Sequence, residues 1–527
     1  MKKIIAFSFA WVLALALPLS ILAQNNACGT SSEDLQALSQ QLLEYKKQNP
    51  LQTRGAIAYV PICFHLVAKT DKSGRVNENR VLDMLAGWND HYTANNVGLQ
   101  FYIKYFNYVN DDGIYNSPRL AFPEGKMQAQ KKSDAMNVYL VNNADDSGTP
   151  GQTLAYYTRA NDWIVCINSQ VTKSFSSTLA HEVGHFFTLL HTFHGWECDS
   201  HHPTPTMPCA PSTISCNGTV FNVENVARTG PDANCETAGD FLCDTPADYN
   251  YGFTRNQDWT NPSRPCVYNG LGKDPKCVAL DPDETNLMGY FINCGSTFSP
   301  MQSALMVKDY STTARRAYLR GGNVEPYTQN IGVATLQQPA DNTSVANFNP
   351  ISFDWADVAG AIGYVFEIST AQTNFDIGRR VVVNGTSNVT LDATNVGTYL
   401  NANVKYYWRV RAFGSYKTMT DYTANFSFTS GAVSAVNEIP GIAGFTVSPN
   451  PVKGTRQIAI GLTTENAFRA NVKIQNLAGQ VVLNEIRNFD SGLINQTLDV
   501  KTLSQGMYIL SIENEKGVLN KKIVISE

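Results

Sequence analysis

Residues 181–191 constrain the fold of this chain more than any other segment, and they read His-Glu-Val-Gly-His-Phe-Phe-Thr-Leu-Leu-His. Histidines four residues apart lie on one face of a helix, so the rings of His181 and His185 can reach the same metal ion. His191 can supply a third nitrogen only if the helix ends and the chain turns back. Three imidazoles leave zinc one exchangeable position, which is typical of a catalytic site. Because Glu182 can act as a base on a water at that position, the segment predicts a zinc hydrolase.

The alternative interpretation is a helix that carries two surface histidines by chance. A third histidine at this spacing makes a chance match much rarer. The flanking residues are mostly apolar, among them Val183, Phe186 and Phe187, which predicts a buried helix. Six of the eight histidines of the chain lie between His181 and His202. These features favour the metal site.

Length and composition bound the class of protein. A chain of 527 residues exceeds what one hydrophobic core organises, and it suggests about three domains. Hydrophobic residues make up 43% of the chain and charged residues 16%, as in a folded protein. The net charge of -5 provides no basic field, so we expect neither nucleic acid nor an anionic membrane as a partner.

The N-terminus has the features of an export signal. A basic start precedes an apolar run over residues 4–22, and Ala23 follows as a plausible cleavage point. We therefore predict a signal peptide at residues 1–23. The alternatives are an uncleaved membrane anchor and lipid attachment at Cys28, although the residues before that cysteine do not fit lipidation. No other apolar run is long enough to span, so we expect no membrane span after signal cleavage.

All eleven cysteines precede residue 295. An exported protein meets an oxidising compartment, so we expect most of these cysteines to form disulfides rather than metal thiolates. Free cytosolic thiols are the alternative, which the signal peptide disfavours.

An α/β pattern follows a polar, helix-prone segment at residues 24–54. We expect strands at 58–66, 99–105, 136–141 and 163–167, and a helix at 78–92. A stretch rich in Pro, Cys, Gly and Asn extends from the third histidine to about residue 283, and its cysteines can cross-link it. Ser299 and Pro300 then begin a helix with the Ser-x-x-Gln capping pattern, which we expect to end near Leu319.

The composition changes past Gly322. Apolar residues alternate with polar ones in short runs, for example at residues 364–368, 404–412 and 458–462. Such alternation with turn signals between the runs is typical of antiparallel β-sandwiches. Histidine is absent from this part of the sequence, so it offers no imidazole metal site.

A second motif, Asn-Leu-Met-Gly-Tyr, stands at residues 286–290. Met288 in a tight turn can form an apolar floor beneath the imidazoles. Tyr290 can donate a hydrogen bond to the oxyanion of a tetrahedral intermediate. The long histidine motif together with a methionine turn is the metzincin arrangement.

Four ordered motifs resemble the pappalysin family, particularly its cytophagalysin branch, over about residues 25 to 320. They are His-Glu-Val-Gly-His with His191-Thr192-Phe193, Gly239-Asp240 with Asp244-Thr245-Pro246, residues 286–290, and Phe298-Ser299-Pro300-Met301-Gln302. The resemblance implies that three imidazoles bind zinc and that three further residues act around it. The zinc ligands would be His181, His185 and His191, with Glu182 as the base, Met288 as the floor and Tyr290 as the transition-state donor.

The resemblance also implies structural calcium. Asp240, Asp244 and Thr245 stand where the family places oxygen ligands, and calcium prefers such ligands. The alternative is that the two acidic residues only cap a turn.

Family members of this kind begin with a short pro-segment that carries Cys-Gly-Thr, found here from Cys28 to Thr30. The Cys28 thiolate could occupy the fourth position of zinc and hold the enzyme latent, as a cysteine switch. The ten other cysteines are then an even number, as a mature secreted domain should have. Arg54 precedes a plausible activation cleavage point. The alternative is that Cys28 pairs with another cysteine.

Two positions depart from the family pattern. Thr188 stands where the family has a glycine that lets the helix end in a left-handed conformation, and a β-branched residue is poor there. The cost is about 1–2 kcal/mol of strain. The residues after Tyr290, at positions 291–294, contain no acid, whereas members that cleave beside arginine carry one. We therefore expect a neutral or apolar preference on the primed side of the cleft.

The two β-rich parts resemble known modules. Residues 332–430 look like a fibronectin type III-like sandwich, through residues 353–355, 363–368 and 406–412. Residues 445–527 resemble the C-terminal sorting domain of type IX secretion substrates, through residues 448–451, 476–480, 503–508 and 521–525. The second resemblance implies export by the type IX secretion machinery of a Gram-negative bacterium, and release or attachment at the cell surface.

The sequence thus predicts a multidomain chain: an α/β (α+β) metzincin-like catalytic domain at residues 55–323, followed by two all-β sandwich domains. The function we expect is that of a secreted zinc endopeptidase, made as a latent zymogen, which hydrolyses proteins or peptides by metal-activated water. The alternative is a cell-surface adhesin whose protease-like domain is weak or inactive. The intact Glu182 and Tyr290 favour the enzyme, and Thr188 favours the adhesin.

Overall fold

The computed structural model describes most of the chain outside its N-terminus. The described residues are 28–48, 57–145, 153–171, 175–198, 209–253, 266–268, 271–291, 294–321, 326, 328–375, 378–391, 400–418, 420–431, 433–434, 439, 441–454, 456–476 and 480–526. The predicted signal peptide and Arg54 lie outside them. Among the described helices, none combines the length and apolar character that crossing a membrane requires.

A five-stranded sheet organises the first half of the chain, with strand order β2-β1-β3-β5-β4. Its strands are β1 (Ala58–Ala68), β2 (Leu99–Asn110), β3 (Met136–Val141), β4 (Ala155–Thr158) and β5 (Trp163–Ile167). Four of them run parallel, and β4 pairs antiparallel with β5 at one edge. All six residues of β3 are buried, as expected for a parallel strand with both faces covered. The four predicted strands are present, and the short β4 is additional.

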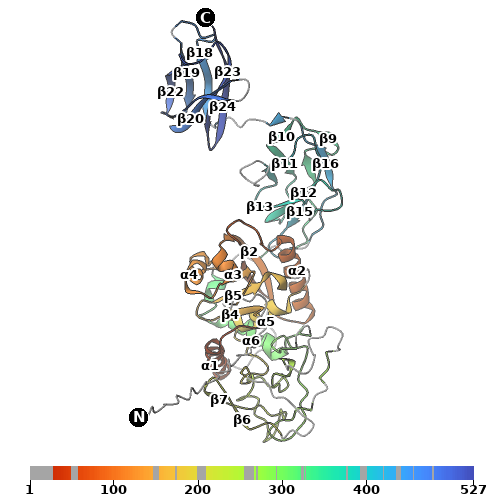
Figure 1. The fold of residues 1–527 in the computed structure, drawn as a ribbon. Coiled ribbons are helices and arrows are strands. Elements are labelled where there is room, and N and C mark those ends of the chain that lie inside the picture. Colours follow the sequence, from red (N-terminus) through yellow and green to blue (C-terminus); the bar gives the residue numbers. More distant parts are fainter. Residues whose placement is uncertain are drawn as a thin grey trace, which may run out of the picture.

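Helices cover this sheet (Figure 1). They are α1 (Ser32–Gln48), α2 (Glu78–Ala94), α3 (Asp112–Asn116), α4 (Ala121–Gln130), α5 (Ser177–Phe186), α6 (Pro300–Thr312) and α7 (Ala317–Arg320). Leu35, Leu38 and Leu42 of α1 are buried in the same hydrophobic core as the sheet. The segment before the first strand is therefore packed onto the α/β part.

The prediction of one helix from Ser299 to about Leu319 is wrong at its end. The capping box at Ser299 is present, but α6 ends at Thr312, and α7 forms only after a turn. The Thr313 hydroxyl donates to the backbone oxygen of Asp309 at 2.7 Å, and the buried Arg316 turns inward to Asp162. A buried guanidinium must reach a carboxylate, so the chain leaves the helical path at this point.

Disulfides hold the long stretch between the third histidine and the methionine turn. Cys198–Cys216, Cys209–Cys277, Cys235–Cys243 and Cys266–Cys294 are bonded. The regular structure described there is a small hairpin, β6 (Thr213–Cys216) and β7 (Thr219–Asn222), and a short 3₁₀ turn at Tyr251–Phe253. The cross-links predicted from the cysteine content are confirmed.

The expectation that most of the cysteines form disulfides is met, but the ten cysteines other than Cys28 do not all pair. Cys63 and Cys166 are buried free thiols. Cys63 lies on β1 and Cys166 on β5, with β3 between these strands in the sheet. Because β3 separates the two strands, Cys63 and Cys166 cannot form a disulfide with each other.

The second half of the chain is all β. The first group comprises β8 (Leu336–Gln338), β9 (Thr343–Ser344), β10 (Asn347–Asn349), β11 (Ile351–Trp355), β12 (Gly363–Ser369), β13 (Arg379–Asn384), β14 (Asn388–Leu391), β15 (Lys405–Phe413), β16 (Phe426–Thr429) and β17 (Val433–Ser434). It forms mainly a three-stranded and a five-stranded sheet around a core that contains Trp355 and Trp408.

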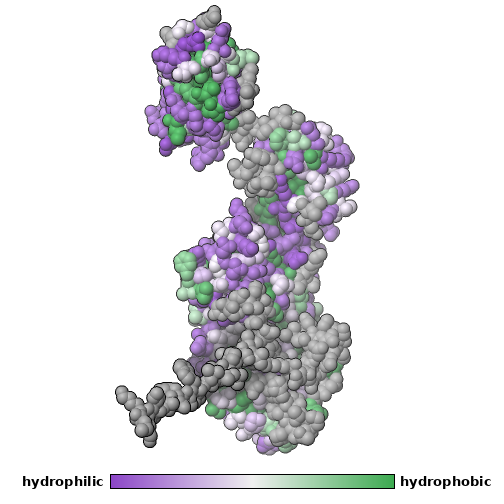
Figure 2. Space-filling model, in the orientation of Figure 1, coloured by the Kyte–Doolittle hydropathy of each residue, from purple (hydrophilic) through white to green (hydrophobic). Residues whose placement is uncertain are grey.

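The last group comprises β18 (Ile442–Ser448), β19 (Gln457–Thr464), β20 (Phe468–Asn476), β21 (Val481–Phe489), β22 (Gly492–Asp499), β23 (Gly506–Asn514) and β24 (Gly517–Ile525). Its three-stranded and four-stranded sheets enclose a separate core. Figure 2 shows apolar surface on this part, and large apolar side chains exposed there include Ile486 and Leu493. The second half of the chain thus consists of β-sheets around two separate cores.

The first β-sandwich contacts α2 and the edge strand β2. Arg411 donates to Asp83 of α2 at 2.6 Å, and Asn79 donates to the Tyr422 hydroxyl at 2.6 Å. The Ile103 amide of β2 donates to the Ser415 carbonyl at 2.7 Å. Polar and backbone contacts thus attach this sandwich to the α/β part.

Candidate active site

Helix α5 carries the first two histidines and ends where the third requires it. Ser176 caps its start by accepting from the Leu179 amide at 3.2 Å. At its other end the Leu189 amide donates to the Gly184 carbonyl at 2.8 Å, and the Thr188 amide to the His185 carbonyl at 2.9 Å. These two bonds form a Schellman motif, in which the residue after the cap is left-handed. Thr188 has φ 74°, so this threonine takes the conformation that usually selects glycine.

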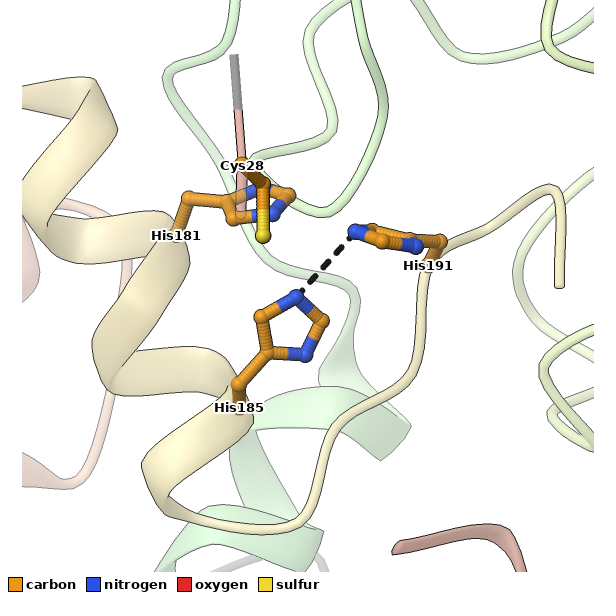
Figure 3. A group of neighbouring side chains, drawn as sticks. All are labelled: Cys28, His181, His185 and His191. Carbon is orange, nitrogen blue, oxygen red and sulfur yellow. Dashed lines mark hydrogen bonds between the residues drawn. The ribbon is translucent and has the colours of Figure 1, made fainter. Parts of the chain in front are cut away.

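The three predicted histidines converge. His181, His185 and His191 are buried, and the Nε2 atoms of His185 and His191 are 3.1 Å apart. One ligand atom from each ring and the Cys28 thiol all lie within 4.8 Å of one another. Figure 3 shows the thiol pointing into the space between the rings.

Oxygen atoms hold the outer nitrogen of each ring. Nδ1 of His181 lies 2.6 Å from the Leu287 carbonyl, and Nδ1 of His185 lies 2.8 Å from the Leu189 carbonyl. Each Nδ1 therefore carries the proton and leaves Nε2 with a free lone pair. Nε2 of His181 is buried without a hydrogen-bond partner among the described residues. The three rings thus present Nε2 lone pairs to one space, and one of these nitrogens, that of His181, has no other partner in the part of the chain that is described. This arrangement fits a metal ion bound by imidazoles.

Burial keeps these rings neutral. Burial and the neighbouring His191 lower the pKa of His181 to about 3. Burial also lowers the pKa of His185 and of His191. Neutral imidazole is the form that binds a metal.

Glu197 is a functional residue that the sequence interpretation missed. Its Oε1 lies 3.3 Å from Nδ1 of His191 and 3.0 Å from Nδ1 of His194, and its Oε2 accepts from the Gly195 amide at 2.7 Å. Burial opposes the charge, but the two histidines hold the pKa of Glu197 well below its usual range. The available signal was a carboxylate six residues after His191. It lies outside any regular element, so no periodic pattern marked it.

Glu182 lies beside the histidine cluster and is fully buried. Its Oε2 accepts from the Thr30 hydroxyl at 3.1 Å, whereas Oε1 has no partner within the described part of the chain. Burial raises the pKa of Glu182 to about 7. A carboxyl group with a pKa near neutral is suited to exchange protons.

The methionine turn lies below the rings. Its turn bond runs from the Gly289 amide to the Asn286 carbonyl at 3.1 Å, and the Met288 carbonyl accepts from the Thr192 amide at 3.2 Å. A Cβ on Gly184 of α5 would meet the Met288 sulfur at 2.3 Å. Only glycine at this position lets α5 approach the methionine so closely. The Tyr290 ring packs against His191, with ring centroids 5.0 Å apart.

The Cys-Gly-Thr segment lies in the site. The Gly29 amide donates to the Ala155 carbonyl of β4 at 2.8 Å, and Cys28 forms a parallel bridge with Ala155. The Tyr290 hydroxyl donates to the Cys28 carbonyl at 3.4 Å. The segment is therefore aligned by the edge strand β4, with its thiol at the histidines.

A cleft runs beside the cluster. Its lining comprises Cys28, Leu154, Gln170, Ser177, Thr178, His181, Glu182, Leu287, Gly289, Tyr290, Phe291 and Gly295. Glu182 is the one carboxylate among these residues, so the lining offers no second acidic partner for a basic side chain.

The structure brings together two of the three predicted calcium ligands. The Thr245 hydroxyl donates to Oδ1 of Asp240 at 2.9 Å. Asp244 instead faces α6, where it accepts from the Ser299 hydroxyl at 2.8 Å and the Met301 amide at 2.7 Å. Burial raises the pKa of Asp240 to about 7, and nearby Glu224, whose pKa is also raised by burial, was not identified from the sequence.

Comparison with known families matches two segments of the chain. Residues 126–234 match the peptidase family described as pregnancy-associated plasma protein-A, and residues 446–526 match the secretion system C-terminal sorting domain. A search of curated proteins gave no match.

Three solved structures illustrate the structural similarity. A promirolysin mutant from Tannerella forsythia is 13% identical, with 56% of this chain and 97% of that chain covered and a TM-score of 0.32. The FN1–FN3 domains of chicken CNTN1 are 13% identical, with 36% and 69% covered and a TM-score of 0.16. The fn3 domain of human contactin 1 is 18% identical, with 22% and 92% covered and a TM-score of 0.17. All three TM-scores are low.

The family matches define a secreted metalloprotease. Its peptidase part resembles the pappalysin family, and its last part is a type IX secretion sorting domain. The sorting domain indicates secretion or a cell-surface location, as predicted.

Proposed function

We propose that the chain is a zinc endopeptidase made as a latent precursor. The observation that carries the proposal is the convergence of His181, His185 and His191, with each outer nitrogen held by an oxygen. Such a set of neutral nitrogens fits zinc with one exchangeable position. The family match supports a metal of this kind and peptide bonds as the substrate.

Glu182 acts as the general base in this proposal. Zinc, when bound, supplies a Lewis acid that activates water and polarises the scissile carbonyl. Glu182 takes a proton from the attacking water and passes it to the leaving amine, so it begins and ends the cycle as a carboxylate. Its pKa of about 7 suits both transfers.

Tyr290 and Met288 complete the machinery. The Tyr290 phenol, which contacts the Cys28 carbonyl at 3.4 Å, donates to the oxyanion once the leading segment has left. Met288 forms an apolar floor that keeps the rings in place. Burial raises the pKa of Tyr290 well above its usual value, so the phenol keeps its proton.

The leading segment makes the precursor latent. The Cys28 thiol would be the fourth ligand of a bound zinc, and it would keep water out of the exchangeable position. Thr30 engages Oε2 of Glu182 at the same time. Cleavage after Arg54 then releases residues 24–54 as a pro-segment.

Finer features belong to the same proposal. The cleft lining supports a neutral or apolar preference on the primed side. The bond between Asp240 and Thr245 supports a calcium site at that turn, without Asp244. The catalytic domain at 55–323 and the β domains at 332–430 and 445–527 remain predicted boundaries.

Incubation of the processed protein with casein, with and without a chelator, tests the proposal. We expect cleavage that stops with the chelator and returns with added zinc. Intact casein despite bound zinc would overturn the endopeptidase and favour the surface adhesin.

A further inference from the structure

The turn after α5 carries a β-branched residue in a left-handed conformation. Thr188 has φ 74° and is fully buried. A side chain other than glycine is strained in this region. Some interaction must therefore favour this conformation over an extended one.

The Thr188 hydroxyl makes two hydrogen bonds. It donates to Oδ2 of Asp309 on α6 at 3.0 Å, and it accepts from Nε2 of Gln41 on α1 at 2.9 Å. Glycine could make neither bond. A buried hydroxyl that loses its partners destabilises the fold by an amount of the same order as this strain. The side chain that creates the strain thus also supplies the contacts that offset it.

Asp309 is itself held in place. Its carboxylate is fully buried and accepts from the Tyr45 hydroxyl at 2.9 Å, the Thr313 hydroxyl at 3.0 Å and the Arg316 Nε at 3.4 Å. Arg316 also donates to the carbonyl of Phe186, the last residue of α5. The end of α5 and the turn after it are therefore fixed from one cluster on α6 and α7.

This turn sets the orientation of two predicted ligands. The Leu189 carbonyl, one residue past Thr188, lies 2.8 Å from Nδ1 of His185. His191 follows three residues after Thr188, so the direction in which the chain leaves the turn decides whether its ring reaches the cluster. A change at Thr188 acts on the metal site through the backbone.

We propose that Asp309 is a positioning residue of the metal centre. Its hydrogen bond keeps Thr188 in the left-handed conformation that orients His185 and His191. In the precursor, the hydrogen bond from Gln41 of α1 to Thr188 stabilises the same conformation. The inference rests on the proposed zinc site, and it explains how the chain tolerates threonine where its family has glycine.

Zinc affinity of the full-length chain tests the inference, measured by competition with a chelator. Thr188→Val keeps the β-branch but loses the hydroxyl, and we expect about 10–100-fold weaker binding. Thr188→Gly removes both strain and hydroxyl, and we expect affinity within about threefold of the wild type. Thr312→Val is the control, because its hydroxyl lies on the same helix but donates to the Lys308 carbonyl at 2.8 Å, which is not one of the bonds to Asp309. We expect this control to bind zinc as the wild type does.

Asp309→Asn in two backgrounds tests the named residue. We expect it to weaken zinc binding in the Thr188 chain and to have a severalfold smaller effect in the Thr188→Gly chain, because no hydroxyl is left to hold. Equal effects in both backgrounds would overturn the inference, as would wild-type affinity in Thr188→Val.

Hydrogen exchange gives a readout that does not depend on zinc. We expect Thr188→Val to speed exchange of the Leu189 amide, and Thr312→Val to leave it unchanged. If the wild type binds no zinc, the proposed function fails, and the exchange data still decide whether Asp309 holds the turn. Unchanged exchange of the Leu189 amide in Thr188→Val would show that the bond between Thr188 and Asp309 does not stabilise the turn.

Discussion

The Thr30 hydroxyl donates to Oε2 of Glu182 at 3.1 Å, across a sequence separation of 152 residues. The same hydroxyl accepts from the Tyr157 amide of β4 at 3.1 Å. Thr30 therefore joins the leading segment, the edge strand and the proposed base in one chain of contacts. The thiol two residues earlier lies at the histidines, so the leading segment engages both the metal site and the base.

Replacement of Cys28 tests latency. We expect unprocessed Cys28→Ala to cleave casein at a clearly higher rate than the unprocessed wild type, because water can enter the position that the thiol holds. Cys63→Ala is the control, since it removes a buried free thiol that lies on β1 and is not part of the cluster of His181, His185 and His191. A Cys28→Ala precursor as inactive as the wild type would assign latency to other contacts, such as that of Thr30.

Glu182→Gln tests the base. We expect zinc content to stay at the wild-type level, because the three imidazoles are unchanged. Turnover should fall by about 10²–10⁴-fold, the usual contribution of a general base. Casein cleavage and elemental analysis on the same sample provide the measurement. Wild-type turnover in this variant would exclude Glu182 as the base.

Glu197→Gln tests the support of His191. A carboxylate that orients a ligand imidazole contributes about 10–100-fold to metal affinity, so we expect zinc binding to weaken by that factor. Glu236→Gln is a suitable control, because the Glu236 side chain is 76% exposed. Chelator competition measures both variants. If the two bind zinc alike, the contact between Glu197 and His191 has no role in affinity.

A thiol count checks the cysteine assignment. The structure has four disulfides and free thiols at Cys28, Cys63 and Cys166. The unprocessed chain, unfolded without reductant, should therefore react with a thiol reagent at three sites. Peptide mapping of the labelled sites identifies them. Reaction at Cys28 alone would contradict the free thiols at Cys63 and Cys166.

Acid should destabilise the α/β part through His65. This histidine on β1 is buried between Asn107 and Asn137, and burial lowers its pKa to about 4. The unfolded chain, with an ordinary histidine pKa near 6.5, binds more protons between these values, so stability falls as the pH drops from about 6.5 to about 4. The loss is about 3 kcal/mol for one group.

Hydrogen exchange of the β1 amides at several pH values measures this dependence. We expect His65→Gln to be less stable at neutral pH but to lack this part of the pH slope. An identical slope in the variant would assign the acid sensitivity to other groups.

Helical spacing predicted the local part of the site, and the family resemblance added Cys28, Met288 and Tyr290, but neither identified Glu197 or Asp309. His181, Glu182 and His185 share one helix, so their relation follows from helical spacing. Asp309 lies 121 residues from Thr188, and only the folded chain brings their oxygens within 3.0 Å. The residue that makes threonine acceptable at the turn could not be identified from the motif itself.

The fold shows the same division. Long buried strands such as β1 and β3 were predicted from apolar runs, whereas β4 has four residues and depends on pairing with β5. The predicted helix to Leu319 failed because the helical pattern carries no record of the ion pair between Arg316 and Asp162. Cysteine number predicted cross-links in general, but strand position decides which thiols can meet.

The disulfides of the region between His191 and Met288 determine when this part of the site can reach its final structure. Four disulfides shape this region, and one of them joins Cys266 to Cys294, four residues past Tyr290. Such bonds persist outside a reducing cytoplasm. The region that carries Met288 and Tyr290 is therefore cross-linked only after the protein has left the compartment where it is made. In the proposed endopeptidase, this order of events would keep the active site from being completed in the cytoplasm, independently of inhibition by Cys28.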